Sequence, residues 1–105
     1  MDYQVVFRET FLGDLERLVR RIAAEDSAAA ARLGHAIVSQ AESLAFFPER
    51  HPRVRQRPML RRYIVARHYK VFYRVRREAA LVEILRCWDG RQDGWPELSA
   101  EEAVS

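Results

Sequence analysis

The chain has 105 residues, of which 49% are hydrophobic and 31% charged, and its formal net charge is +3. One cysteine and three histidines are too few for an internal disulfide or a zinc site, and no apolar run approaches the roughly 20 residues of a membrane helix. The N-terminus lacks a signal-peptide pattern, so we expect one cytoplasmic domain that does not enter a membrane.

The N-terminal half predicts a strand followed by two helices. Tyr3 to Arg8 is rich in β-forming residues, and Thr10 is a candidate cap for the helix that follows. That helix has an apolar stripe at Leu12, Leu15, Val19 and Ile22. Asp26 or Ser27 would cap a second helix over Ala28 to Phe46, with its stripe at Ala30, Leu33, Ile37, Ala41 and Leu44.

The C-terminal half predicts a loop and three sequential strands. Phe47-Pro48 ends the second helix, because a residue before proline avoids helical geometry. The expected strands are Met59–Val65, Lys70–Arg76 and Leu81–Trp88, and Asp89-Gly90 forms a turn after the last of them. The fold class is therefore α+β in the order β-α-α-β-β-β, a helical hairpin packed on a small, mainly antiparallel sheet.

The strand Lys70–Arg76 has two different faces. Val71, Tyr73 and Val75 alternate with the remaining side chains, and we expect them to pack under the two helices. Lys70 and Arg74 should then lie solvated on the open side of the sheet. Residues 1–95 form the domain, and residues 96–105 form an acidic tail in which Ser99 and Glu102 have capping-box spacing for a short helix.

Positive charge is concentrated in one stretch of the chain. Arg50 to Arg77 holds eleven basic residues and no acidic one, whereas the rest of the chain holds 7 basic and 15 acidic residues. Aromatic and β-branched residues alternate with this charge, which favours strands with a basic face over a solvated tail. Such a face attracts polyanions or an acidic protein partner.

The ordered set of motifs resembles the RelE/ParE toxin superfamily. The motifs are Asp14-Leu15, Leu44, Phe47-Pro48, Tyr69 to Val75 and Val82 to Arg91. The resemblance covers nearly the whole chain and implies a compact α+β toxin encoded beside an antitoxin, with growth inhibition and plasmid stabilization as its consequences. Some members of this superfamily cleave messenger RNA on the ribosome, and others poison DNA gyrase.

Within this superfamily, the residues at the active surface distinguish the RNA-cleaving branch from the gyrase-binding branch. Lys70 and Arg91 match basic positions of the RNA-cleaving branch, but no tyrosine follows Arg91, where the aromatic residue is Trp95. Asp89 stands where related sequences often carry histidine before glycine. These departures favour the ParE-like branch, which acts by binding gyrase and implies no catalytic residues.

The candidate site residues depend on which activity the chain has. RNA cleavage without a metal needs an acid, a base and cations at the phosphate, and the candidates are Lys70, Arg91 and His68. The candidate residues for binding a nucleic acid or another target are Arg53, Arg55, Arg57, Arg61, Arg62, Lys70, Arg74 and Arg91. We expect packing roles for Tyr69, Tyr73 and Cys87, solvated or packing roles for His35 and His51, and neither a metal nor a cofactor.

The function predicted from the sequence is therefore the toxin of a type II toxin–antitoxin pair. In its ParE-like form it would bind DNA gyrase without catalysing a reaction and would be neutralised by a cognate antitoxin. The alternatives are a ribosome-dependent messenger RNA endoribonuclease and a non-toxic RNA- or protein-binding domain.

Overall fold

The computed structural model describes residues 2–91, in which the chain forms two α-helices and five strands. The elements are β1 (Gln4–Phe7), α1 (Glu9–Ala23), α2 (Ser27–Glu42), β2 (Arg53–Val54), β3 (Arg57–Val65), β4 (Tyr69–Arg76) and β5 (Leu81–Asp89). The predicted α+β order is confirmed, with the short β2 as an addition. The predicted acidic tail, residues 96–105, lies outside the described residues.

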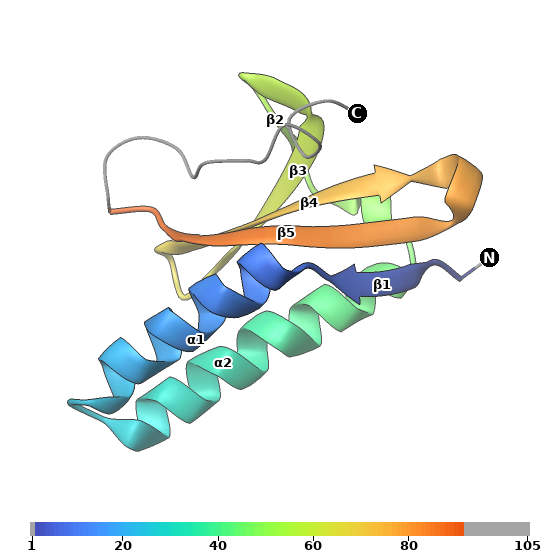
Figure 1. The fold of residues 1–105 in the computed structure, drawn as a ribbon. Coiled ribbons are helices and arrows are strands. Elements are labelled where there is room, and N and C mark those ends of the chain that lie inside the picture. The colour runs from blue at the N-terminus through green and yellow to red at the C-terminus, as the bar shows by residue number, and fades with distance from the viewer. Residues whose placement is uncertain (1, 92–105) are drawn as a thin grey trace.

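The strands form one mixed sheet in the order β1-β5-β4-β3-β2. β1 runs parallel to β5, and the other neighbours are antiparallel. The helices α1 and α2 lie side by side against one face of the sheet, so the molecule has two layers (Figure 1). This arrangement leaves the opposite face of the sheet, called the open face below, without a helix from the described residues.

The first helix begins differently from the prediction. Its N-cap is Arg8, which makes no capping hydrogen bond, and the Thr10 hydroxyl donates to the Leu85 carbonyl at 2.8 Å. The predicted cap at Thr10 is therefore wrong. Phe11 is fully buried and stacks on Phe7, whereas Leu12 is 49% exposed. The buried stripe is thus rotated away from Leu12, because Phe11 provides the larger apolar surface.

The second helix follows the prediction closely. The Asp26 carboxylate accepts a hydrogen bond from the Ala29 amide at 3.0 Å, which confirms the predicted cap. All five residues of the predicted stripe are buried. The helix ends at Glu42, earlier than expected, and a 3₁₀ turn at Ser43–Ala45 carries Leu44 into the core. Phe47, which precedes Pro48, takes a left-handed conformation with φ of 47°.

The core lies between the helices and the sheet, as the alternation in β4 predicted. Val71 and Tyr73 are fully buried in it, and Val75 packs at its margin. Two buried tyrosines bond to the chain around them: the Tyr63 hydroxyl donates to the Ile37 carbonyl at 2.8 Å, and the Tyr73 hydroxyl to the Pro48 carbonyl at 2.7 Å. Burial raises the pKa of Tyr73 to about 12, so its hydroxyl stays protonated as a donor.

The open face has a small apolar cluster of its own. Val54, Leu60, Phe72 and Leu85 are buried there, and Trp88 packs against them. A bulge in β5 helps to form it: Phe72 pairs with Arg86 and Tyr73 with Ile84, so Leu85 is the additional residue. The alternation of side chains changes at this point.

Arg74 corrects one expectation about the open face. It lies on the predicted side of β4, but only 3% of its surface is exposed. The prediction of a solvated side chain was therefore wrong, and the reason is a buried carboxylate on the neighbouring strand.

Candidate functional site

That carboxylate belongs to Glu83 of β5, which binds three arginines. The Nε atoms of Arg8, Arg74 and Arg76 donate to it at 2.9, 2.9 and 2.7 Å. Burial would raise the pKa of Glu83, but the hydrogen bonds from these arginines outweigh it and lower the pKa to about 2. Sequence analysis did not identify Glu83, although a lone carboxylate inside the apolar run Leu81 to Leu85 indicates a buried ion pair.

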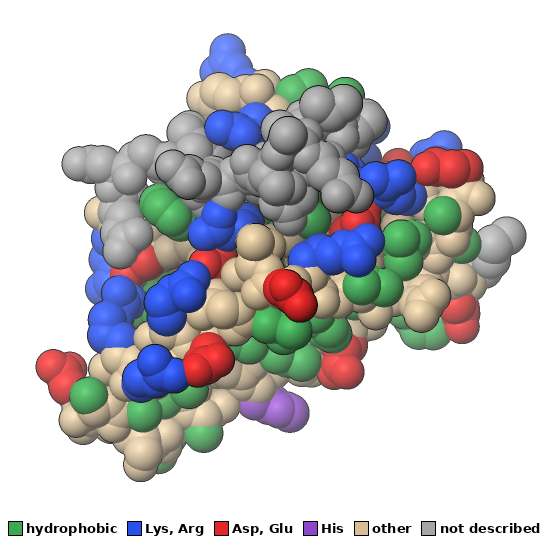
Figure 2. All heavy atoms as spheres, in the orientation of Figure 1, with side chains coloured by type: hydrophobic (Ala, Val, Ile, Leu, Met, Phe, Trp, Pro, Cys, Tyr) green, Lys and Arg blue, Asp and Glu red, His purple; other side chains and the backbone are tan. Residues whose placement is uncertain are grey.

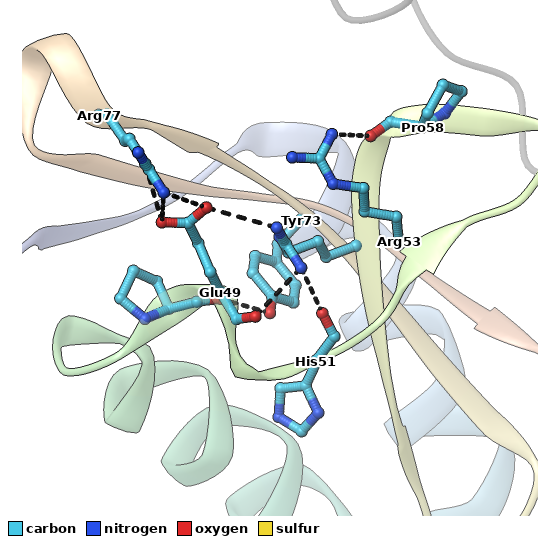
Figure 3. A network of polar contacts seen from close by, with 8 residues as sticks. Glu49, His51, Arg53, Pro58, Tyr73 and Arg77 are labelled. Atoms are coloured by element: carbon cyan, nitrogen blue, oxygen red, sulfur yellow. Dashed lines mark hydrogen bonds and ion pairs between the residues drawn. The ribbon is translucent and has the colours of Figure 1, made fainter.

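Arg61 of β3 also makes structural contacts. Its Nη1 donates to the carbonyls of Glu49 and His51 at 3.1 and 2.7 Å, and its Nη2 lies 3.4 Å from the Glu49 carboxylate. Arg77 donates to the same carboxylate through Nε and Nη2, both at 2.9 Å. Figure 3 shows Glu49 directed toward Arg77, with the Tyr73 ring beside it. Glu49 therefore joins β3 to the segment that follows β4.

The other predicted cations of this region are more accessible. Arg53 and Arg55 are exposed, and Arg57 and Arg62 are half-buried. Arg53 donates to the Pro58 carbonyl at 3.2 Å across the narrow β2–β3 turn. Figure 2 shows Lys and Arg side chains next to Asp and Glu side chains on another face of the molecule, where the helices meet the sheet. On α1, Arg20 pairs with Glu16 and Arg21 with Asp89, so ion pairing extends beyond the open face.

Lys70 and His68 lie at the opposite end of the β3–β4 hairpin from these residues. Lys70 pairs with Ile64 on one side and Trp88 on the other, and His68 is exposed in the turn. The Gly90 amide donates to the His68 carbonyl at 2.6 Å, and a Cβ on Gly90 would lie 2.7 Å from that oxygen. Glycine is therefore required there, and it holds the end of β5 against the turn.

Arg91 is fixed beside this turn by a carboxylate. Its Nε and Nη2 donate to the two oxygens of Asp89 at 3.0 and 2.9 Å, and this side-chain bond lowers the pKa of Asp89 to about 2. Arg91 Nη2 also donates to the Tyr69 hydroxyl at 3.3 Å. The His68 ring meets the Tyr69 ring edge-on, with centroids 6.3 Å apart. We call His68, Tyr69, Lys70, Asp89 and Arg91 the turn-end cluster.

A second carboxylate, Asp14 of the Asp14-Leu15 motif, supports the end of β5 from α1 through contacts that the sequence did not predict. Asp14 is buried and accepts from Arg86 Nε at 2.7 Å and from the Cys87 amide at 3.0 Å. It thereby holds the residues just after the β5 bulge. Cys87 is buried as expected, and burial raises its pKa to about 12, so its thiol is not ionised at neutral pH.

The remaining histidines lie outside the turn-end cluster. His51 is half-buried against the rings of Tyr63 and Tyr73, and burial lowers its pKa. His35 is exposed on α2. Within residues 2–91, no group of three or more His, Cys, Asp or Glu side chains could hold a metal ion, and no helix there is long and apolar enough to cross a membrane.

The structure thus places six of the predicted site residues in two groups. Arg53, Arg61 and Arg74 lie around the split between the start of β3 and the end of β4, and Lys70, Arg91 and His68 lie at the other end of the hairpin. A helical hairpin on a five-stranded mixed sheet, with arginines on its open face, is the α+β architecture that the resemblance to the RelE/ParE superfamily implied.

The sequence itself identifies the family within that class. The family profile of the ParE toxin of the type II toxin–antitoxin system parDE matches residues 5–94. The chain therefore belongs to this family and is a toxin of type II toxin–antitoxin systems. No curated protein sequence gave a significant match.

Solved structures agree with this assignment. A chain of the RelBE2 toxin–antitoxin complex from Mycobacterium tuberculosis is 27% identical, with a TM-score of 0.63 over 85% of this chain and 99% of that chain. The chromosomal ParDE system of P. aeruginosa gives a TM-score of 0.72 at 18% identity, over 83% and 95% of the two chains. A mutant of E. coli RelE in the free state gives 0.64 at 15% identity, over 85% and 84%. The last two show the fold alone.

Proposed function

We propose that this toxin acts in the cytoplasm, arrests growth by binding DNA gyrase, and is held inactive by a cognate antitoxin. The observation that carries the choice of gyrase is the bidentate contact between Asp89 and Arg91. Arg91 is the C-terminal cation that a ribonuclease of this superfamily would use at the phosphate. In this chain an ionised carboxylate occupies its guanidinium and would repel a phosphate approaching the same point.

The family match supports the same choice. The matched profile describes the ParE toxin of parDE, and it spans β1 through the end of β5. The arginine pairing on the open face supports a binding role as well, because Arg61 and Arg74 have their guanidinium groups on Glu49 and Glu83. These contacts give a rigid, charged surface suited to recognition of a protein.

A specific observation favours the ribonuclease as the second candidate. The turn-end cluster brings His68, the Tyr69 hydroxyl and Lys70 to one end of the sheet, next to Arg91. Such a site would need one group to take the proton of the 2′-hydroxyl, another to protonate the leaving oxygen, and cations at the phosphate. His68 and the two cations provide part of that set.

The test is induced expression of the chain without an antitoxin, with two readouts in the same culture. We expect growth arrest together with a DNA damage response, and no discrete cuts in ribosome-bound messages. Purified protein should inhibit supercoiling by gyrase in vitro. Discrete messenger RNA 5′ ends with a silent DNA response would favour the ribonuclease, and normal growth with neither signal would favour the non-toxic binding domain.

An Asp89→Asn variant distinguishes the gyrase-binding activity from the ribonuclease activity. It removes the charge that pairs with Arg91 while keeping a side chain of similar shape. If the chain is a gyrase-directed toxin, RNA cleavage stays absent in wild type and variant alike. If it is a ribonuclease restrained by Asp89, cleavage should increase in the variant. Lys70→Ala is the matched control, because it should abolish any cleavage that the variant shows.

A further inference from the structure

The arginines of this protein differ in whether a carboxylate neutralises them. Within residues 2–91, carboxylates pair with Arg8, Arg17, Arg20, Arg21, Arg61, Arg74, Arg76, Arg77, Arg86 and Arg91. Arg53 instead donates to the carbonyl of Pro58, a neutral acceptor. In the part of the chain that the structure describes, the Arg55 side chain has no hydrogen bond or ion pair. The positive charges of Arg53 and Arg55 therefore remain available to a partner.

Both of these arginines lie at one end of the β2–β3 hairpin. The strands meet at a turn formed by Arg55 and Gln56, and Val54 pairs with Arg57 across it. We call residues 53–57 the hairpin tip. Figure 1 shows this end of the sheet directed away from both helices. Val54 is 2% exposed and belongs to the apolar cluster of the open face, so it anchors the tip to the sheet.

Contacts with β3 also fix the backbone that leads into the tip. The Arg62 amide donates to the Pro52 carbonyl at 3.2 Å, and Arg61 Nη1 donates to the His51 carbonyl at 2.7 Å. Together with the buried Val54, these bonds hold the chain on either side of the turn. A partner therefore does not have to order the hairpin, and this lowers the entropic cost of binding to it.

The chemistry of the hairpin tip suits a nucleic acid better than a protein. Its exposed side chains are those of Arg53, Arg55 and Gln56, all of them polar, and exposed apolar surface begins only at Pro58 and Met59. Protein interfaces usually have an apolar core, whereas interfaces with DNA are more polar and strongly positive. The planar guanidinium group can donate two parallel hydrogen bonds to the oxygens of one phosphate.

We propose that the hairpin tip binds duplex DNA, with Arg53 and Arg55 on backbone phosphates and the Gln56 amide at the base edges. A two-stranded ribbon fits the major groove of B-DNA, which is about 12 Å wide, whereas the major groove of double-stranded RNA is too narrow to admit it. In the cell this DNA is the segment that gyrase holds. That role beside gyrase deepens the proposed function and rests on it, while DNA binding itself can be measured without gyrase.

The experiment measures binding of a fluorescein-labelled DNA duplex to the full chain by fluorescence anisotropy, over a series of salt concentrations. In the double variant Arg53→Ala and Arg55→Ala, we expect the dissociation constant at low salt to rise by about tenfold. The slope of log affinity against log salt should fall by about 2, because two phosphate contacts are lost. Circular dichroism confirms that each variant is folded.

The matched control is the double variant Arg32→Ala and Arg67→Ala. Both arginines are exposed, lie outside the hairpin tip and have no carboxylate partner within residues 2–91, so the control removes the same charge. Its dissociation constant should stay within about threefold of wild type, with a nearly unchanged salt slope. If the control weakens the DNA as much as the tip variant does, the attraction is that of the whole surface and the proposal is wrong.

Two other ligands test the choice of duplex DNA. A double-stranded RNA of the same sequence should bind about fivefold more weakly than the DNA and should respond little to the tip variant, because the hairpin cannot enter its major groove. RNA binding as tight as that of DNA, with the same loss in the tip variant, would overturn the assignment to DNA. A polyglutamate peptide that displaces the DNA at an equal concentration of charge would assign the tip to an acidic protein instead.

Inhibition of gyrase supercoiling, measured on the same preparations, separates this inference from the proposed function. We expect the tip variant to lose inhibition together with DNA binding, and the control variant to keep both. If wild type binds DNA through the tip but leaves gyrase active, the proposed function fails and the DNA site remains. If wild type inhibits gyrase and the tip variant binds DNA as tightly as wild type does, the DNA site fails and the proposed function remains.

Discussion

At the scale of single residues, several arginines of this protein bind carboxylates of the same chain. Arg74 is 3% exposed and lies on Glu83, which is 2% exposed. Replacing Arg74 by alanine leaves that carboxylate with Arg8 and Arg76 and opens space beside it. We expect Arg74→Ala to lower the free energy of unfolding by about 2–3 kcal/mol, measured by urea denaturation.

Arg53→Ala is the matched control for this prediction. Arg53 is exposed and makes one hydrogen bond, to the Pro58 carbonyl. Its replacement should change stability by no more than about 0.5 kcal/mol. Equal urea midpoints for the two variants would show that the buried ion cluster contributes no net stability.

Glu83 also predicts how stability depends on acid. Its pKa in the folded chain is about 2, below the ordinary value of 4.5, so folding favours the ionised carboxylate. The contribution is fully present above pH 4.5 and is lost as the pH falls through 2. The difference corresponds to about 3 kcal/mol. A series of urea melts between pH 6 and pH 2 should therefore show a shallower loss of stability in Glu83→Gln than in wild type.

The sequence did not predict which carboxylates bind these arginines. Glu49, Glu83 and Asp14 each bind a partner from a distant part of the chain, and a pattern of local spacing cannot reveal such a pair. The concentration of basic residues between Arg50 and Arg77 is visible in the sequence. Which of them are bound within the protein depends on the three-dimensional pairing of the strands.

At the scale of elements, the N-terminus of α2 offers a clean test of capping. The Asp26 side chain accepts from the Ala29 amide at 3.0 Å. Asp26→Ala should lower stability by about 1 kcal/mol, because that amide loses its partner. Ser27→Ala, one residue further on, is the control and should have little effect, since the structure assigns the cap to Asp26. A thermal melt with equal losses in both variants would contradict this assignment.

Elements with a clear period were predicted and those without one were not. The alternation of β4 and the stripe of α2 identified the buried side chains correctly, because one face of each is apolar throughout. β2 has only two residues, too few to show a period. The bulge in β5 lies inside an apolar run in which both faces are buried, so no change in pattern marks it. In α1, Phe7 and Phe11 fixed the rotation through a ring contact that the stripe did not show.

At the scale of the whole molecule, the basic surface should govern how fast a partner arrives. Arg53, Arg55 and Arg57 lie together on the short β2–β3 segment. Reversing all three to glutamate should slow association with the antitoxin by about tenfold at low salt and flatten the dependence of the rate on salt. Stopped-flow fluorescence measures this. An on-rate no lower than that of an equally charged variant at Arg20, Arg32 and Arg67 would remove this segment from the encounter surface.

The parallel pairing of β1 with β5 has a consequence for synthesis of the protein. Gln4 pairs with Leu81 and Phe7 with Ile84. The first strand to leave the ribosome therefore has no pairing partner until the last strand, β5, has been made. The hairpin of β3 and β4 can form sooner, because its strands are neighbours in sequence. A nascent chain therefore cannot complete its sheet until residues 81–84 have emerged. The complete toxin surface therefore forms only late in synthesis. An antitoxin already present in the cell can bind the toxin as soon as that surface forms.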